Sequence, residues 1–298
     1  MRRVKSWSLF ALIGTFMISL LLPHGAWAGT DTVVTLGKDL TADQRQTVMR
    51  NLEAPDGVET LEVSIQDVER YLGNHVDKAT IGTKAYSSAK VTLAKEGSGI
   101  RVDTTNVTKI TPQMYANALI TAGVKDAEVT VTAPIQVSGT TGLTGIMMAF
   151  ETATDQEISD EQKDLANEEM VITSELGEKI EDSDKATQFI AEVKEEIAEQ
   201  QPQTKEEVRD IIINVAGDLN INLGDQDVDR VTDTMHRFSE LDIDWNSLGN
   251  QLNELKNNFD EMIGNIDLDS EEAQGFLSGL LDWLSELWDA ITSVFATE

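Results

Sequence analysis

The feature that most limits how this chain can fold is a change in the period of its apolar residues near Phe150. Before that point, runs in which apolar and polar residues alternate are mixed with helix-like segments, a pattern typical of strands combined with helices. After it, apolar residues recur only at the three- and four-residue spacing of helices. We therefore predict an α+β fold, with an N-terminal mixed α+β domain followed by an all-α helical domain.

The charge distribution changes at the same place. Residues 29–150 carry 14 acidic and 11 basic side chains, whereas residues 151–298 carry 39 acidic and 9 basic ones. A shift this abrupt indicates a domain boundary. We predict an α+β domain over residues 29–155 and an acidic helical domain with a C-terminal amphipathic helix over residues 156–298. Because the interval from Thr152 to Asp184 is polar and weakly capped, we expect limited proteolysis to cut there.

Composition excludes several classes of function. The net charge of −30 excludes a protein that binds nucleic acid by neutralising phosphates, because that affinity comes from Lys and Arg. The absence of Cys excludes disulfides, thiol catalysis and thiolate metal sites. Beyond residue 28 the chain has two histidines, His75 and His236, each expected at the surface or at a helix end. A His-based triad or a two-His metal site would need both to meet across the predicted boundary.

The first 28 residues have the pattern of a secretory signal. Basic residues precede an uncharged apolar stretch from Ser8 to Leu22, and Ala26 and Ala28 provide the small residues that a signal peptidase inspects. The apolar stretch is shorter than the roughly 20 residues that a membrane-spanning helix needs. We expect cleavage before Gly29 and no transmembrane span afterwards; an uncleaved anchor is the alternative.

Local signals place the individual elements. Capping-box patterns beginning at Thr41, Ser159 and Thr204 predict three helix starts. Thr111 followed by Pro predicts another helix, closed by Gly123. Strands are expected at residues 33–36, 60–64, 90–95, 100–105 and 127–137. The Gly-rich turn over residues 96–99 predicts that the third and fourth of these strands pair as a hairpin.

The acidic half contains connectors in which apolar and Asx residues alternate, at residues 219–222, 241–244 and 266–269. The second Asx of each is expected to cap the next helix, while the apolar residues anchor the turn. Carboxylates cluster beside these connectors, and we expect weak, diffuse Ca²⁺ or Mg²⁺ binding there because these ions take oxygen ligands. The clusters are Asp225, Asp227 and Asp229, then Asp267, Asp269, Glu271 and Glu272. The sequence indicates no other cofactor.

A loop rich in glycine and threonine joins a predicted strand to a predicted helix at residues 138–145. Backbone N–H groups and the positive end of the helix dipole could receive an anion there. The residues concerned are Gly139, Thr140, Thr141, Gly142, Thr144 and Gly145. The alternative, which we favour, is a tight turn in which small residues permit close packing, because the loop lacks the Lys of a Walker motif.

The predicted last helix, over residues 271–295, has a broad apolar stripe and an acidic opposite side. The expected role of the stripe is packing on other helices, with binding of a partner helix as the alternative. Membrane contact is less favoured, because helices that lie on membranes usually carry basic residues. The residues that would bind a partner are Leu280, Leu284, Leu287, Trp288 and Ile291.

Three segments resemble the YpuA-like proteins, a family of secreted proteins of Gram-positive bacteria that is classed as a domain of unknown function. The similar segments are Val33–Thr41, Thr111–Gly123 and Ala133–Gly145. The likeness covers most of the chain after residue 28 and is strongest before residue 150. It implies an extracytoplasmic location in a cell-envelope setting, and it implies no reaction and no catalytic residues.

We therefore interpret the chain as a secreted, envelope-associated protein with a non-enzymatic binding function, whose partner is an envelope protein or a wall component. The near-neutral α+β domain would make the specific contact, and the acidic helical domain would serve as a spacer or partner-binding module. The alternative is an extracytoplasmic hydrolase that uses a pair of carboxylates. Clustered buried acids in a cleft would favour the hydrolase, whereas an apolar groove or exposed patch would favour the binding protein.

Overall fold

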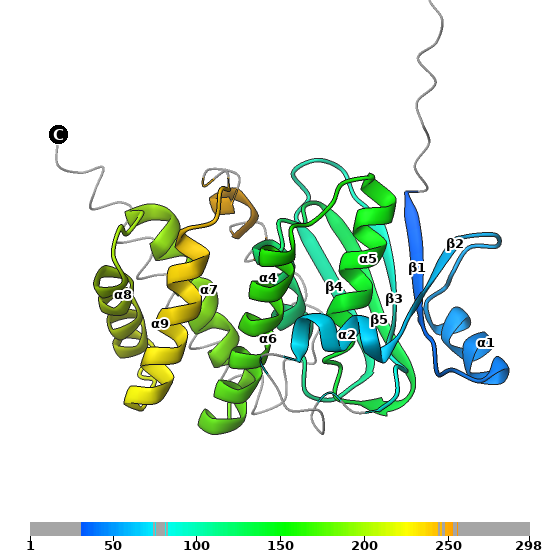
Figure 1. Cartoon of the computed structure of the whole chain (residues 1–298), viewed down its shortest axis with the longest axis horizontal. Helices are drawn as coiled ribbons and strands as arrows, with labels where there is room; N and C mark the ends of the chain where they lie inside the picture. The colour runs from blue at the N-terminus through cyan, green and yellow to red at the C-terminus, as the bar shows by residue number, and fades with distance from the viewer. Residues whose placement is uncertain are drawn as a thin grey trace, which may run out of the picture.

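The computed structural model describes residues 31–73, 75, 81, 83–243, 245, 248–252 and 255. These residues form a five-stranded sheet with helices on both faces and a group of further helices beside it (Figure 1). The α+β class predicted from the sequence is confirmed. The predicted signal and the predicted last helix lie outside the described residues. No helix in the described part combines the length and apolar character that crossing a bilayer requires.

The sheet has the strand order β2-β1-β3-β5-β4. β1 pairs in parallel with β2 and β4 in parallel with β5, whereas β3 is antiparallel to both of its neighbours. In the middle of the sheet, Val129 of β5 lies opposite Val91 of β3 and Val102 of β4. The strands are β1 (Thr32–Gly37), β2 (Glu59–Val63), β3 (Ser88–Leu93), β4 (Ile100–Val107) and β5 (Ala127–Val137).

The predicted hairpin between the third and fourth strands is wrong. β5 inserts between β3 and β4, so these two consecutive strands do not pair with each other. The connection over residues 94–99 spans two strand spacings, about 10 Å, which its length allows. Local turn chemistry cannot reveal this insertion, because β5 enters the sheet about thirty residues later in the chain. Val129 and Val131 of β5 are buried, as expected for a central strand.

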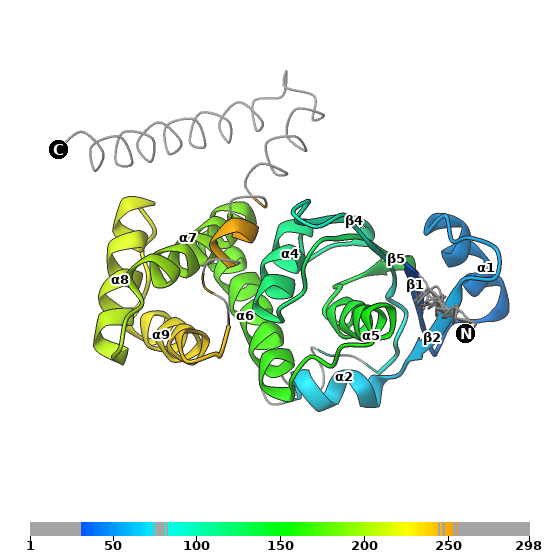
Figure 2. The ribbon, with the colours of Figure 1, turned by 90° about the horizontal axis from the view of Figure 1, so that it is seen from above.

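The helices of the first half cover the two faces of the sheet (Figure 2). α4 and α5 pack on one face, where they share a core with Val33, Val91 and Val129 of the strands. α1 packs on the other face, against Val34 and Leu36 of β1. These helices are α1 (Ala42–Asn51), α2 (Ile65–Leu72), α4 (Pro112–Thr121) and α5 (Gly142–Thr154). The predicted caps at Thr41 and Thr111 are confirmed.

The second half, as far as it is described, is helical. Its helices are α6 (Asp160–Ile180), α7 (Ser183–Gln200), α8 (Lys205–Asp218) and α9 (Asp225–Ser239). The predicted capping boxes at Ser159 and Thr204 are confirmed. Asn222 does not cap the next helix, because α9 begins directly after Gly224. The apolar residues of that connector, among them Ile221, do pack against the core as predicted.

α6 is the central helix of the molecule and occupies most of the interval interpreted above as polar and weakly capped. That interpretation is wrong, because Leu165, Met170 and Ile172 of this helix are buried. α6 packs on α2 and α4 on one side and on α7 and α9 on the other. One apolar cluster continues from Val33 through these helices to Leu252. The two sides of the predicted boundary at residue 155 therefore share a core.

Candidate functional site

The turn between β5 and α5 contains the six residues of the predicted anion loop. Gly139 has a φ of 98°, in the left-handed region that favours glycine, and its carbonyl accepts a hydrogen bond from the buried Tyr115 hydroxyl. A Cβ atom on Gly142 would lie 2.5 Å from the Tyr115 hydroxyl, and one on Gly145 would lie 2.7 Å from Oγ1 of Thr35. These contacts fit the packing interpretation of the glycines. Burial raises the pKa of Tyr115, which keeps the phenol as a donor.

A surface groove of about 360 Å³ opens beside this turn. All six predicted loop residues are buried; Gly139 and Thr141 line the groove, whereas Thr140, Gly142, Thr144 and Gly145 do not. The remaining lining combines polar and apolar side chains. It includes Lys84, Ser87, Tyr86, Ile135 and Val137.

The groove has an unusual charge for this molecule. Of the described residues that line it, Lys84 is charged and none is acidic, although the chain has 53 acidic residues against 23 basic ones. Thr141, which precedes the first turn of α5, makes no side-chain capping hydrogen bond. The positive end of the α5 dipole therefore reaches the groove without a side-chain cap. Ile135, another lining residue, is 51% exposed, so the groove could hold an anionic group and an apolar group together.

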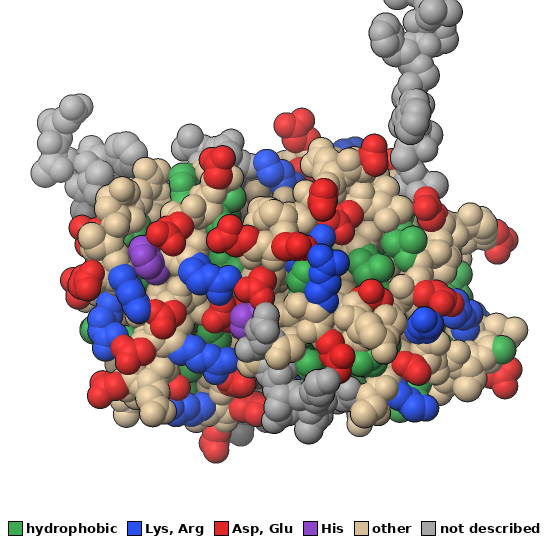
Figure 3. Space-filling model, in the orientation of Figure 1, with side chains coloured by type: hydrophobic (Ala, Val, Ile, Leu, Met, Phe, Trp, Pro, Cys, Tyr) green, Lys and Arg blue, Asp and Glu red, His purple; other side chains and the backbone are tan. Residues whose placement is uncertain are grey.

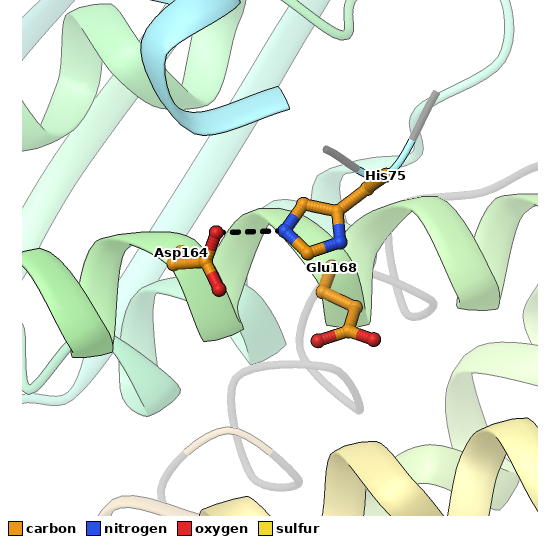
Figure 4. Close-up of side chains that lie close together, drawn as sticks. All are labelled: His75, Asp164 and Glu168. Atoms are coloured by element: carbon orange, nitrogen blue, oxygen red, sulfur yellow. Dashed lines mark hydrogen bonds and ion pairs between the residues drawn. The ribbon is translucent and has the colours of Figure 1, made fainter. Parts of the chain in front are cut away.

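A second cluster joins a histidine to two acidic residues of α6 (Figure 4). Asp164 and Glu168 lie four residues apart and project from successive turns of the helix, on one side of it. His75 follows the end of α2, and its Nε2 lies 2.8 Å from Oδ1 of Asp164. Ligand atoms of all three side chains lie within 4.8 Å of one another. Among the described residues, this is the group whose geometry could hold a metal ion.

Arg237 of α9 connects the two carboxylates of this cluster. Its guanidinium donates to Oδ2 of Asp164 at 2.8 Å and to Oε2 of Glu168 at 2.5 Å. Burial opposes ionisation of Asp164, but the hydrogen bonds and charges of Arg237 and His75 outweigh it and hold the pKa of that carboxyl below its usual range. A general acid needs a raised pKa, so Asp164 is not suited to that role in the hydrolase alternative.

The acidic residues of α9 that were predicted to attract Ca²⁺ or Mg²⁺ face basic partners on neighbouring helices. Asp227 pairs with Lys179 of α6, and Asp229 pairs with Arg209 of α8. On the face shown in Figure 3, Lys and Arg side chains are scattered among the acidic ones on the helical side. Asp225 begins α9. The second predicted cluster, Asp267, Asp269, Glu271 and Glu272, lies outside the described residues, as do the predicted partner-binding residues of the last helix.

A third group, which the sequence analysis missed, is a fully buried ion pair between Glu169 of α6 and Lys194 of α7. The Nζ atom of Lys194 lies 3.2 Å from Oε1 of Glu169, and it donates to the backbone oxygen of Asn117 at 2.8 Å and to Oγ1 of Thr121 at 2.9 Å. It also lies 5.4 Å from the ring centroid of Phe238. The contacts thus join α4, α6, α7 and α9. Burial raises the pKa of Glu169 and lowers that of Lys194, although each charge partly offsets the shift of the other.

The sequence contains a pattern that predicts the burial of Lys194, but none that predicts the contacts of Arg237. Lys194 follows Ile190 by four residues and precedes Ile197 by three, so it lies on the apolar stripe of its helix. A charged residue in that position indicates burial with a partner. Asp164 and Glu168 have the four-residue spacing of one helix face, but the same spacing recurs among many of the other acids. Nothing local indicates that Arg237 would reach them.

Comparison with known proteins identifies relatives of the chain. The family described as "Protein of unknown function (DUF1002)" matches residues 36–255. The chain is 38% identical over 295 residues to "Uncharacterized protein YpuA" of Bacillus subtilis (strain 168), an alignment that covers 98% of this chain and 99% of that relative. No solved structure matches the chain. The resemblance drawn from the sequence segments is thereby confirmed.

Proposed function

This chain belongs to the DUF1002 family, and on that premise we propose that it is a non-enzymatic binding protein that acts outside the cytoplasm in association with the cell envelope. The observation that carries this proposal is the groove beside the β5–α5 turn. Its described lining has a Lys and no carboxylate, in a chain with a net charge of −30. We infer that the groove receives an anionic group of an envelope component.

The chemistry of the groove supports this ligand class. An anion would contact the Lys84 ammonium and the N-terminal end of α5, where the dipole favours negative charge. Ile135 and Val137 would bury an apolar group attached to that anion. An apolar portion of a groove beside polar groups is the combination that ligand-binding sites use.

In this proposal the two halves of the chain have different tasks. Residues 29–150 have a net charge of only −3, so a ligand with negative charge can approach the groove, whereas residues 151–298 have a net charge of −30. The acidic helical part would then be a solvated spacer or a surface for a protein partner. The same acidity opposes docking of that part onto an anionic wall or onto nucleic acid.

The location rests on the signal pattern in the first 28 residues and on a relative from a Gram-positive bacterium. N-terminal sequencing of protein recovered from the envelope fraction tests it directly. We expect a first residue of Gly29, as cleavage after Ala28 gives. Recovery of a chain that begins at Met1 would instead favour an uncleaved anchor.

The binding role can be tested with two groove variants and one matched control. Purified protein is incubated with isolated cell envelopes, and the retained fraction is measured for the wild type and for Lys84→Glu, Ile135→Asp and Ile213→Asp. Ile213 of α8 is 49% exposed and lines a different groove, so its variant controls for the loss of an exposed Ile. We expect the first two variants to bind at least tenfold more weakly and the control to bind as the wild type does. Equal retention of all four proteins would refute the groove as the binding site.

A further inference from the structure

We propose that His75, Asp164 and Glu168 form a binding site for a divalent transition-metal ion, with zinc as the best match. The three side chains offer one imidazole nitrogen and two carboxylate oxygens within 4.8 Å of one another. This site is distinct from the groove at the β5–α5 turn, and the proposal does not depend on the function assigned to that groove.

The fold holds the three residues in place from two elements. Asp164 and Glu168 are one helical turn apart on α6. His75 reaches them because α2 packs on α6, where Leu72 shares an apolar cluster with Val171. The backbone N–H of His75 donates to the carbonyl oxygen of Leu72 at 2.9 Å, which fixes the histidine relative to the end of α2. The imidazole is 10% exposed, so it is largely withdrawn from water, and its Nε2 is directed at Oδ1 of Asp164.

Arg237 supports the carboxylates in the way that outer residues support metal ligands. It binds Oδ2 of Asp164 and Oε2 of Glu168, which leaves the second oxygen of each carboxylate for a metal ion. Oδ1 of Asp164 faces His75, and Oε1 of Glu168 has no hydrogen bond from the residues that the structure describes. Ligating carboxylates are usually hydrogen-bonded through the oxygen that does not bind the metal, and such bonds orient them.

The charges of the cluster leave room for a cation. The two carboxylates and the guanidinium together sum to about −1, and Glu161 adds further negative potential at Arg237. A divalent ion therefore meets a net attraction even beside the arginine. The alternative is that the cluster is only a set of ion pairs, in which Arg237 and His75 satisfy both carboxylates. In that case the cluster would not bind a metal ion, so a binding measurement distinguishes a metal site from a set of ion pairs.

The donor set selects the class of ion. Imidazole with carboxylates suits zinc and its neighbours in the first transition series, whereas Ca²⁺ and Mg²⁺ prefer sites built from oxygen alone. A tetrahedral site with bonds of about 2 Å has edges of about 3.3 Å, so the most distant ligand atoms must close by about 1.5 Å, which side-chain rotation can supply. Three protein ligands leave the fourth position to water, as in open zinc sites.

The test is a zinc titration of the purified, metal-stripped full chain without a histidine tag, followed by calorimetry. We expect one zinc ion per chain for the wild type, and at least a tenfold loss of affinity in His75→Gln and in Glu168→Gln. His236→Gln is the matched control. His236 also lies near a carboxylate, that of Glu240 at 3.8 Å, but it is not part of the three-residue group that could hold a metal ion. This variant should bind zinc as the wild type does.

A second measurement tests whether zinc binds at His75. In nitrogen-resolved NMR of the imidazoles, zinc should shift the signals of His75 and leave those of His236 in place, and Ca²⁺ should shift neither. Thermal unfolding of each variant shows whether it is folded. If His75→Gln is not folded, the comparison rests on Glu168→Gln. The proposal is overturned by an absence of stoichiometric binding, by several equivalent weak ions per chain, or by equal affinities in the wild type, His75→Gln and Glu168→Gln.

Discussion

The buried ion pair of Glu169 with Lys194 and the exposed ion pairs along α9 join many of the same helices, but only the exposed pairs are in water. Glu169 and Lys194 are 1% and 0% exposed, whereas Asp229 and its partner Arg209 are 63% and 37% exposed. Water screens the exposed charges and makes each pair nearly neutral in energy. The buried charges have lost their hydration, so each depends on the other and on the hydrogen bonds of α4.

This comparison shows where the two halves of the chain are joined. Lys194 of α7 donates to the backbone oxygen of Asn117 on α4, which is a helix of the sheet-containing half. The exposed pairs such as Arg230 with Glu175 and Lys205 with Asp233 stay within the helical half. Other exposed pairs, such as Lys109 with Glu178, do cross between the halves. The seam between the two halves therefore contains both the buried, energetically costly pair and exposed pairs of little net energy.

The largest expected effect comes from cutting the chain at the seam. The sequence predicts that a fragment ending near residue 150 unfolds cooperatively by itself. The shared core favours the opposite result, because removal of α6 to α9 exposes the faces of α4 that pack on α6 and α7. We expect a fragment of residues 29–155 to lose its cooperative urea transition, monitored by tyrosine fluorescence against the full chain. A single sharp transition in the fragment would show two independent domains.

Removal of one member of the buried pair should have the next largest effect. Lys194→Met or Glu169→Gln leaves a partner without its counterpart in the interior, and we expect each to lower the free energy of unfolding by about 3–5 kcal/mol. The double variant Lys194→Met with Glu169→Leu removes both charges and should be close to the wild type or more stable. Urea unfolding of the wild type, Lys194→Met, Glu169→Leu and the double variant measures this cycle, with Glu169→Gln measured alongside. Additive losses in the double variant would contradict the interpretation.

The change with pH in the free energy of unfolding of Glu169→Gln should be smaller than the losses above and larger than the effect of an exposed pair. Burial lowers the pKa of Lys194. A lysine whose pKa is lowered on folding contributes stability at pH values above its unfolded pKa, near 10.4, and this contribution is lost as the pH falls through the pKa of the folded state. In Glu169→Gln the carboxylate that partly offsets this shift is absent, so the pKa of Lys194 is lowered further. We therefore expect the deficit of this variant relative to the wild type to shrink as pH rises from 7 towards 10. A constant deficit over that range, measured by urea unfolding, would exclude an orphaned charge as its cause.

The smallest effect is expected for an exposed pair. Arg209→Gln and Asp229→Asn each remove one member of a solvated pair between α8 and α9, and we expect changes of about 0–1 kcal/mol in the free energy of unfolding, reduced further by salt. Urea unfolding at low and high ionic strength measures both variants. A loss as large as that of Lys194→Met would show that the contrast between the two settings is wrong.

The sequence by itself determined the local structure of this protein. The capping boxes at Thr41, Ser159 and Thr204 and the Thr111-Pro start fixed four helix beginnings, because these signals act within four residues of the backbone groups that they satisfy. The alternating pattern predicted β5 with the bounds that the structure has. Family membership and the α+β class also followed from residues read in order.

Only the tertiary structure decided which of these elements meet. The insertion of β5 between β3 and β4 is a pairing with a segment distant in the sequence, so no signal at the turn over residues 96–99 could reveal it. The burial of α6 could not be predicted from its polar composition, because Glu169 is compensated by Lys194, a residue 25 positions away. His75 meets Asp164 across 89 residues. Contacts between distant residues are set by how whole faces pack, and local propensities carry no information about them.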